Sequence, residues 1–166
     1  MKTALLCCLM SVAAFADSAG GLSWKQPAGW KADAPRAMRA ATYLVPAAKG
    51  DSEGAECGVF YFGQGQGGGV EQNIQRWVGQ FEGGKAPIQK KEKLGGFEVT
   101  TVEVDGTFAS SMGGPMGAKT PKAGYKLLGA IVEAPGGNVF FKLTGPAKTV
   151  EAARADFIKM LKGVTK

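Results

Sequence analysis

The sequence predicts an α+β protein with a single domain, folded as an α/β/α sandwich with a mostly antiparallel central sheet and two main helices. Three observations support this fold class. Strand-like segments follow one another across short turns, which favours antiparallel pairing. Several of these segments carry apolar side chains on both faces, as in a sheet that is covered on both sides. Two further segments have the apolar spacing of amphipathic helices, so each can cover one face of the sheet.

Three strands are expected before the first helix. Residues 17–21 form a small, polar lead-in, and residues 22–30 form a short strand and a Pro-Ala-Gly turn that bury two tryptophans. Residues 38–45 have strand character and stop at a proline. In residues 55–62, apolar side chains point to both faces, which indicates a central strand.

The first helix is expected at residues 70–82, directly after a glycine run at residues 63–69 that serves as a flexible connector or, alternatively, as an anion cradle. Gly83 and Gly84 are expected to end this helix. Its polar residues Asn73, Arg76 and Gln80 border the apolar side. The apolar side itself consists of Val70, Ile74, Trp77, Val78 and Phe81.

The next two strands differ in character. Residues 86–93 are rich in lysine, as expected of an edge strand that is protected from pairing with other chains. Residues 97–108 form a long strand whose apolar phase shifts near residues 100–101, so a bulge or burial on both faces is expected there. Residues 110–124 are rich in glycine and proline, have no periodicity and are expected to form a long loop.

The chain closes with a hairpin and a helix. Residues 125–134 and 139–144 are apolar segments joined by a Pro-Gly-Gly-Asn turn. Thr149 is expected to cap the last helix, and Gly163 is expected to end it. The buried stripe of this helix is Val150, Ala153, Phe157 and Leu161.

The first residues predict export. Residues 1–16 have the charged start, the apolar stretch and the Ala-Phe-Ala site of a signal peptide, with cleavage after Ala16 or Ala19. The domain then spans residues 17–166, in a periplasmic or extracellular protein. No other segment has the about 20 apolar residues of a transmembrane helix. The only cysteine after the signal is Cys57, so no internal disulfide is expected.

The charge pattern indicates which classes of partner to expect. The chain of 166 residues has a formal net charge of +6, but its lysines are spread along the sequence. No aromatic and basic residues alternate as in a stacking platform, so nucleic acid is not expected as a partner. The expected partner is an unknown protein or small ligand of the cell envelope, and the oligomeric state is left open.

The sequence lacks the residues that several kinds of catalysis and metal binding require. The sequence has no histidine, which excludes Ser-His-Asp and Cys-His nucleophile systems and the commonest ligand of transition metals. Cys57 lies among apolar residues, where a thiol is an inert hydrophobe. No cofactor and no catalytic residue are therefore expected, and the protein is predicted to be a binding domain rather than an enzyme.

The candidate binding site combines the 70–82 helix with the 110–124 loop, since long loops in compact domains are often functional. Arg76 either ties the helix to loop carbonyls together with its polar neighbours, or faces a cleft as a cation for a carboxylate or phosphate. The candidate ligand-binding residues are Asn73, Arg76, Gln80, Met112, Met116, Lys119, Lys122 and Tyr125.

Two alternative functions stay open. Met112 and Met116 with Met38 or Cys57 would make a soft donor set for Cu(I), in which case the protein is a copper carrier. Glu103 and Asp105 share one face of a strand, so a hydrolase that uses carboxylates alone is the other alternative.

The order of elements, with a Pro-x-Gly-Trp turn at residues 27–30 after the first strand and a closing helix, resembles the PsbP-like α/β/α sandwich. Residues 73–81, with the pattern N-I-x-R-W-x-x-Q-F, also resemble a recurring helix of uncharacterised exported bacterial proteins. In that group, residues 128–130 and 142–146 would be further matching segments. These resemblances imply a fold and an exported location, bring no known activity, and do not carry a photosystem function to this chain.

Overall fold

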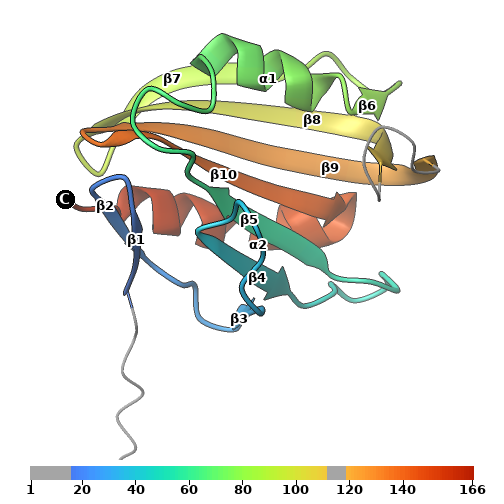
Figure 1. Ribbon diagram of the computed structural model, residues 1–166. Helices are drawn as coiled ribbons and strands as arrows, with labels where there is room; N and C mark the ends of the chain where they lie inside the picture. The colour runs from blue at the N-terminus through green and yellow to red at the C-terminus, as the bar shows by residue number, and fades with distance from the viewer. Residues whose placement is uncertain (1–15, 112–118) are drawn as a thin grey trace, which may run out of the picture.

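The computed structural model describes residues 16–111 and 119–166 as two helices and ten strands. Eight strands form one antiparallel sheet in the order β3-β4-β5-β10-β9-β8-β6, in which β7 also pairs with β8 (Figure 1). This confirms the α+β fold class. The elements are β1 (Ala16–Ala19), β2 (Leu22–Lys25), β3 (Lys31–Ala32), β4 (Ala41–Val45), β5 (Ala55–Phe60), α1 (Val70–Val78), β6 (Phe81–Glu82), β7 (Ile88–Leu94), β8 (Phe97–Ser111), β9 (Lys119–Ala134), β10 (Gly137–Pro146) and α2 (Ala147–Lys162).

The centre of the sheet is the expected hairpin of β9 and β10. Its two strands pair from Gly137 opposite Ala134 to Pro146 opposite Tyr125. β10 is buried on both faces, because Phe140 contacts one core cluster and Phe141 the other. At the edge, β7 pairs only with β8 and exposes its lysines, as the pattern of residues 86–93 predicts.

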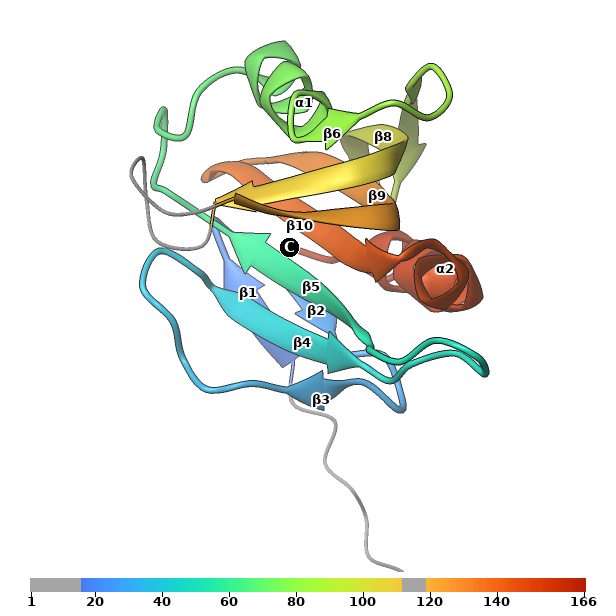
Figure 2. The same ribbon diagram turned by 90° about the vertical axis from the view of Figure 1, so that its right-hand side faces the viewer.

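The two helices lie on opposite faces of the sheet (Figure 2). The α2 side is the larger core, because the small β1-β2 sheet joins α2 over the same face. There Trp24 packs edge-on against Phe141, with ring centroids 5.3 Å apart. Trp24 Nε1 donates a hydrogen bond of 2.7 Å to the Tyr43 hydroxyl, which donates in turn to Asp17. The polar lead-in expected at residues 17–21 is therefore wrong in part, since residues 16–19 are a paired strand.

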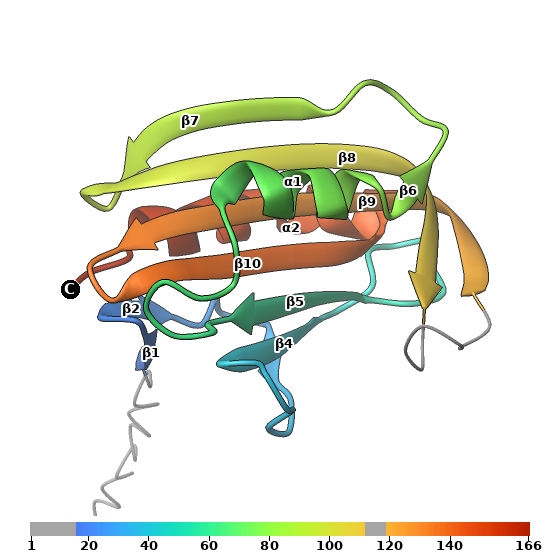
Figure 3. The same cartoon turned by 45° about the horizontal axis from the view of Figure 1, so that its top comes forward.

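The opposite face, which we call the α1-side face, is only partly covered. α1 lies over β8 and β9, where Ile74 and Trp77 are buried against the sheet. Figure 3 shows that no helix covers β4 and β5 on this face. On the α2 side, by contrast, the β1-β2 sheet reaches these strands, since Trp24 of β2 contacts Tyr43 of β4. The uncovered half of this face holds the candidate site.

The helix expected at residues 70–82 is shorter in the structure. It ends at Val78, where the N–H of Gly79 closes the last turn on the carbonyl of Gln75. Phe81 then leaves the helix to pair with Phe108 of β8. Glycine favours a helix end at position 79, and the free edge of β8 supplies hydrogen bonds that a continued helix would forgo.

The loop expected at residues 110–124 is wrong for its described parts. β8 continues to Ser111 and β9 begins at Lys119, so both strands extend beyond the helices. Their backbones pair as far as Ser111 opposite Lys119. Glycine and proline favour loops in isolation, but a partner strand at the correct register supplies the hydrogen bonds that the composition discourages. We call residues 106–111 with 119–124 the arm.

The structure decides two further details of the expected elements. Near residues 100–101 the register of β8 is regular, and the apolar phase shift reflects burial on both faces, since Val99 and Thr100 are both buried. The register shift lies between Gly106 and Phe108, at the base of the arm. In α2, Thr149 lies inside the first turn rather than at the cap, and its N–H donates 2.9 Å to the carboxylate of Asp51.

Candidate functional site

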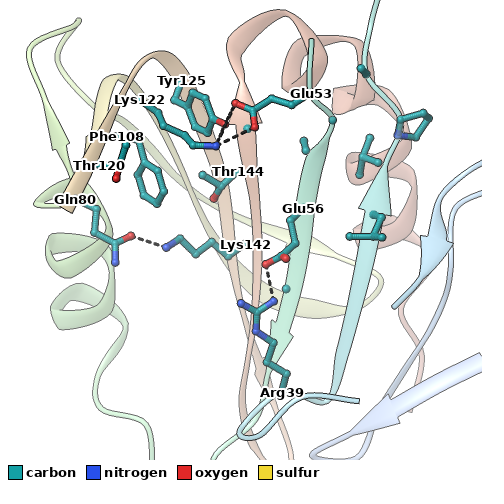
Figure 4. A pocket seen from close by; sticks show the side chains of 18 of the residues that line it. Arg39, Glu53, Glu56, Gln80, Phe108, Thr120, Lys122, Tyr125, Lys142 and Thr144 are labelled. Carbon is teal, nitrogen blue, oxygen red and sulfur yellow. Dashed lines mark hydrogen bonds and ion pairs between the residues drawn. The ribbon is translucent and has the colours of Figure 1, made fainter. Parts of the chain in front are cut away.

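A cavity of about 900 Å³ opens on the uncovered half of the α1-side face (Figure 4). Residues of β4, β5 and β10 form its floor, and the arm forms one wall. Gln80, which follows α1, forms one end. We call this cavity the pocket. Its polar lining residues are Arg39, Glu53, Glu56, Gln80, Thr120, Lys122, Tyr125, Lys142 and Thr144.

Lys142 is the central cation of the pocket. Its position on β10 places the side chain on the α1-side face, half-buried, where the ammonium donates a hydrogen bond to Oε1 of Gln80. It lies 5.7 Å from the ring centroid of Phe108. Among the described residues, its ammonium forms no ion pair with a carboxylate. Burial, followed by the nearby cations Arg39 and Arg76, lowers the pKa of Lys142 to about 8, although Glu56 acts in the opposite direction.

Thr144 follows Lys142 by two residues, so both side chains face the pocket from β10. The hydroxyl oxygen of Thr144 is buried and has no hydrogen-bond partner in the described part of the chain. Buried polar groups are nearly always paired, and an unpaired one costs about 1–3 kcal/mol. The hydroxyl lies just beneath the pocket surface, and a rotation of the side chain would present it to a bound group.

Arg39 closes the pocket on the β4-β5 side. Its Nη1 lies 2.6 Å from Oε1 of Glu56, and its guanidinium carbon lies 5.1 Å above the ring of Phe60. Arg36 contacts the other oxygen of Glu56 at 2.9 Å. The carboxylate of Glu56 is thus held between two guanidinium groups, which leaves it no role as a free acid.

The other end of the pocket is closed by a triad that joins the β4-β5 turn to the arm. The ammonium of Lys122 lies 2.8 Å from Glu53, and the Tyr125 hydroxyl donates 2.5 Å to the same carboxylate. The hydrogen bond from Lys122, and then that from Tyr125, lowers the pKa of Glu53. Burial and Glu53 raise the pKa of Tyr125. The Tyr125 ring also stacks on Phe108, with centroids 5.8 Å apart.

The structure brings together three of the eight residues that the sequence singled out. Gln80, Lys122 and Tyr125 line the pocket. Asn73 is buried and donates to the carbonyl oxygens of Gly67 and Gly69, at 2.8 and 2.9 Å.

Arg76 is exposed and donates to the side-chain oxygen of Asn73. This bond stays within the helix, whereas Asn73 holds the glycine run, and Arg76 is not among the residues that line the pocket. Met112, Met116 and the side chain of Lys119 lie outside the described residues.

Sequence reasoning missed the residues that complete the pocket: Arg39, Phe60, Phe108, Lys142 and Thr144. One signal was present. Lys142 interrupts the apolar run of residues 139–143, which is expected to form a hairpin with residues 125–134. A lysine in such a strand must reach water, a partner or a cavity, because burying an unpaired charge is costly.

The carboxylates named for a hydrolase take part in structural contacts. Glu103 contacts Lys126 at 2.6 Å and Arg154 at 2.8 Å. Burial alone would raise the pKa of Glu103, but the hydrogen bonds from Arg154 and Lys126 hold it below its ordinary value. Asp105 accepts the backbone N–H of Lys85 at 2.9 Å. Neither carboxylate lines the pocket.

The donors named for copper are dispersed where the structure describes them. Cys57 is fully buried in the core on the α2 side, and burial raises the pKa of its thiol. Met38 is 72% exposed. In residues 16–111 and 119–166, no three His, Cys, Asp or Glu side chains cluster as metal ligands do. Copper binding through Met112 and Met116 stays a prediction.

Comparison with solved structures identifies the fold. The chain is similar to the solution structure of cyanobacterial PsbP (CyanoP) from Synechocystis sp. PCC 6803, with a TM-score of 0.53 over 96% of each chain and 10% sequence identity. The protein has a PsbP-like fold. The PsbP-like resemblance seen in the order of elements is thereby confirmed as a likeness of fold.

Other comparisons do not extend this result. A scan against protein-family models found no match, and a search of curated proteins found none. In the described part of the chain, no helix combines the length and the apolarity needed to cross a membrane.

Proposed function

We propose that this PsbP-like protein is an exported, non-enzymatic binding domain that holds a small organic anion in the pocket. The observation that carries this proposal is the ammonium of Lys142, which faces the cavity with Gln80 as its only hydrogen-bond partner among the described residues. A cation in such a half-buried position gains more from an anionic partner than an exposed one does.

The rest of the pocket specifies the kind of anion. Arg39 and Lys122 flank Lys142, but each already has a carboxylate partner in Glu56 or Glu53. One anionic group on the ligand therefore suffices, placed at Lys142 beside the Thr144 side chain that lines the pocket. A carboxylate fits this position, because it accepts hydrogen bonds on two oxygens.

The apolar walls favour a ligand with a flat organic body. Phe108 of the arm lies beside Lys142 (Figure 4), and Phe60 of β5 lines the same pocket. A cavity of about 900 Å³ also lies within the range of small-ligand sites. An aromatic carboxylate would place its ring against these side chains and its charge on Lys142.

The lack of catalytic groups supports binding rather than turnover. The sequence contains no histidine, and both carboxylates at the pocket are held by basic side chains. Export is proposed from the signal-like residues 1–16, which supply the charged start, the apolar stretch and a small-residue cleavage site.

Titration with benzoate, followed by ¹H–¹⁵N NMR of residues 17–166, tests the proposal. Benzoate should shift the backbone amides of Lys142, Thr144 and Phe60. The Lys142→Met variant should bind roughly tenfold or more weakly, because it removes the charge and keeps the volume. Lys90→Met, on the exposed edge strand β7, removes the same charge elsewhere and should bind as the wild type does. Equal affinity of the Lys142→Met variant would overturn the proposal, as would shifts confined to other surfaces.

A further inference from the structure

The amine of Lys142 differs from those of the other lysines near the sheet centre. Lys122 and Lys126 each contact a carboxylate, at 2.8 and 2.6 Å. Lys142 has the neutral side chain of Gln80 instead, and its nitrogen faces the open volume of the pocket. A lysine that is not held by a carboxylate can give up its proton and expose its lone pair.

The charges around Lys142 favour that loss. Arg39, from the segment before β4, and Arg76, on α1, place positive charge near the ammonium, and Glu56 on β5 offsets part of it. Together with burial, these groups bring the pKa of Lys142 to about 8. A much larger share of Lys142 is therefore neutral near pH 7.5 than of an exposed lysine with an ordinary pKa of about 10.4.

We propose that Lys142 captures the aldehyde or ketone group of a carbonyl-bearing organic acid as a reversible imine in the pocket. This inference rests on the proposed function, because it uses the same cavity and the same class of anion. It goes further by assigning Lys142 a covalent role and by adding a carbonyl group to the ligand.

The chemistry balances without an oxidant or a reductant. The lone pair of the neutral amine attacks the carbonyl carbon, and the π electrons of the C=O bond move to its oxygen, which takes a proton. The nitrogen lone pair then forms the C=N bond as the C–O bond breaks, and the hydroxyl group leaves as water with a second proton. Both protons derive from the amine, so the net products are one imine and one water.

Three neighbours suit this step. Gln80 accepts a hydrogen bond from Lys142 and so orients the nitrogen. Thr144 lines the same cavity, and a rotation of its side chain would let the unpaired hydroxyl donate to the oxygen as charge develops on it. Both side-chain hydrogen bonds of Arg39 in the described chain use Nη1, so Nη2 and Nε are left as donors for the carboxylate of the ligand.

Reductive trapping with 4-formylbenzoate and cyanoborohydride tests the inference on residues 17–166. Intact mass and peptide mapping should find one adduct, on Lys142, formed about tenfold or more faster than on any other lysine. Its rate should rise with pH and level off above about 8. Excess benzoate should slow it by competition. Label spread over surface lysines at similar rates would overturn the inference, as would a Lys142 that takes no label.

Controls separate this inference from the proposed function. Lys142→Arg removes the nucleophile and should abolish the single adduct, whereas Lys90→Arg should leave it unchanged. If the wild type binds benzoate in the pocket but yields no adduct with 4-formylbenzoate, only the imine is overturned. If benzoate does not bind, the proposed function fails. An adduct on Lys142 would then show a reactive amine in a pocket that has no anion site.

Discussion

Trp77 of α1 packs directly on Gly129 of β9. A Cβ atom at position 129 would lie 2.5 Å from Cζ3 of Trp77, closer than real Cβ contacts come. Trp77 is buried and meets Phe140 edge-on, with ring centroids 6.4 Å apart. The missing side chain at Gly129 thus lets the helix lie close to the sheet, and the helix in turn places Gln80 beside Lys142.

The first prediction follows from this contact. Gly129→Ala should lower the free energy of unfolding by about 1–3 kcal/mol, because the added methyl group forces the indole away from the sheet. Urea denaturation measures the change. Gly69→Ala is the matched control, since a Cβ there meets nothing within 4 Å, and only a smaller capping effect is expected. Equal stability of the Gly129→Ala variant and the wild type would contradict the close packing.

The second prediction separates structure from binding at Asn73. Asn73→Ala removes two hydrogen bonds to the carbonyls of Gly67 and Gly69 and should destabilise the protein by about 1–3 kcal/mol. Benzoate affinity should stay within about twofold of the wild type, because Asn73 does not line the pocket. The exposed neighbour Gln72→Ala should change neither quantity. A loss of affinity at unchanged stability would return Asn73 to the binding site.

The third prediction concerns acid stability. Hydrogen bonds from Arg154, and secondarily from Lys126, lower the pKa of Glu151 from 4.5 to about 2. Because the folded pKa is the lower one, the ion pair contributes stability above about pH 4.5, and this contribution is lost as the pH falls to about 2. The Glu151 side chain is 53% exposed, so the effect should stay below about 1 kcal/mol.

Urea denaturation of Glu151→Gln from pH 7 to pH 2 tests this effect. The variant should lose the part of the pH dependence that Glu151 contributes, and the two proteins should converge at the acid end. Glu92→Gln, on exposed β7, is the matched control and should follow the wild type. A constant difference between Glu151→Gln and the wild type at every pH would contradict the assignment.

The fourth prediction concerns the start of the domain. Asp17 accepts a hydrogen bond from the buried hydroxyl of Tyr43, and its strand pairs with β2. A protein that begins at Gly20 should therefore be less stable than one that begins at Asp17, by about 1–3 kcal/mol for the lost acceptor alone. Thermal and urea unfolding compare the two. Asp17→Asn retains an acceptor and should lie between them. Equal stability would contradict this role of Asp17, and sequencing the N-terminus of the protein isolated from its cell tests whether cleavage follows Ala16 or Ala19.

The elements that the sequence predicts well are those whose pattern is local. The spacing of Ile74 and Trp77 places them on one side of α1, and both are buried. The lysines of residues 90–93 mark an exposed edge strand, and the apolar side chains on both faces of residues 55–62 mark a central one. Each of these signals depends on a few consecutive residues and one neighbouring layer.

The errors occur where a distant partner decides the structure. Phe81 leaves the helix for β8, and residues 120–124 become strand, because β8 offers unpaired backbone groups to both. The pocket was missed for the same reason. Arg39, Lys142 and Gln80 are far apart in the chain, and only the order of strands in the sheet brings them to one cavity.

The sequence by itself determined the class of fold, the two helices, the buried and inert Cys57 and the absence of imidazole chemistry, because these follow from residue types and short-range periodicity. Only the tertiary structure decided that α1 leaves half of one sheet face uncovered and that Lys142 faces the resulting cavity without a carboxylate partner among the described residues. The physical reason is that strand order and helix length determine which side chains meet, and neither can be deduced from a single segment of the chain.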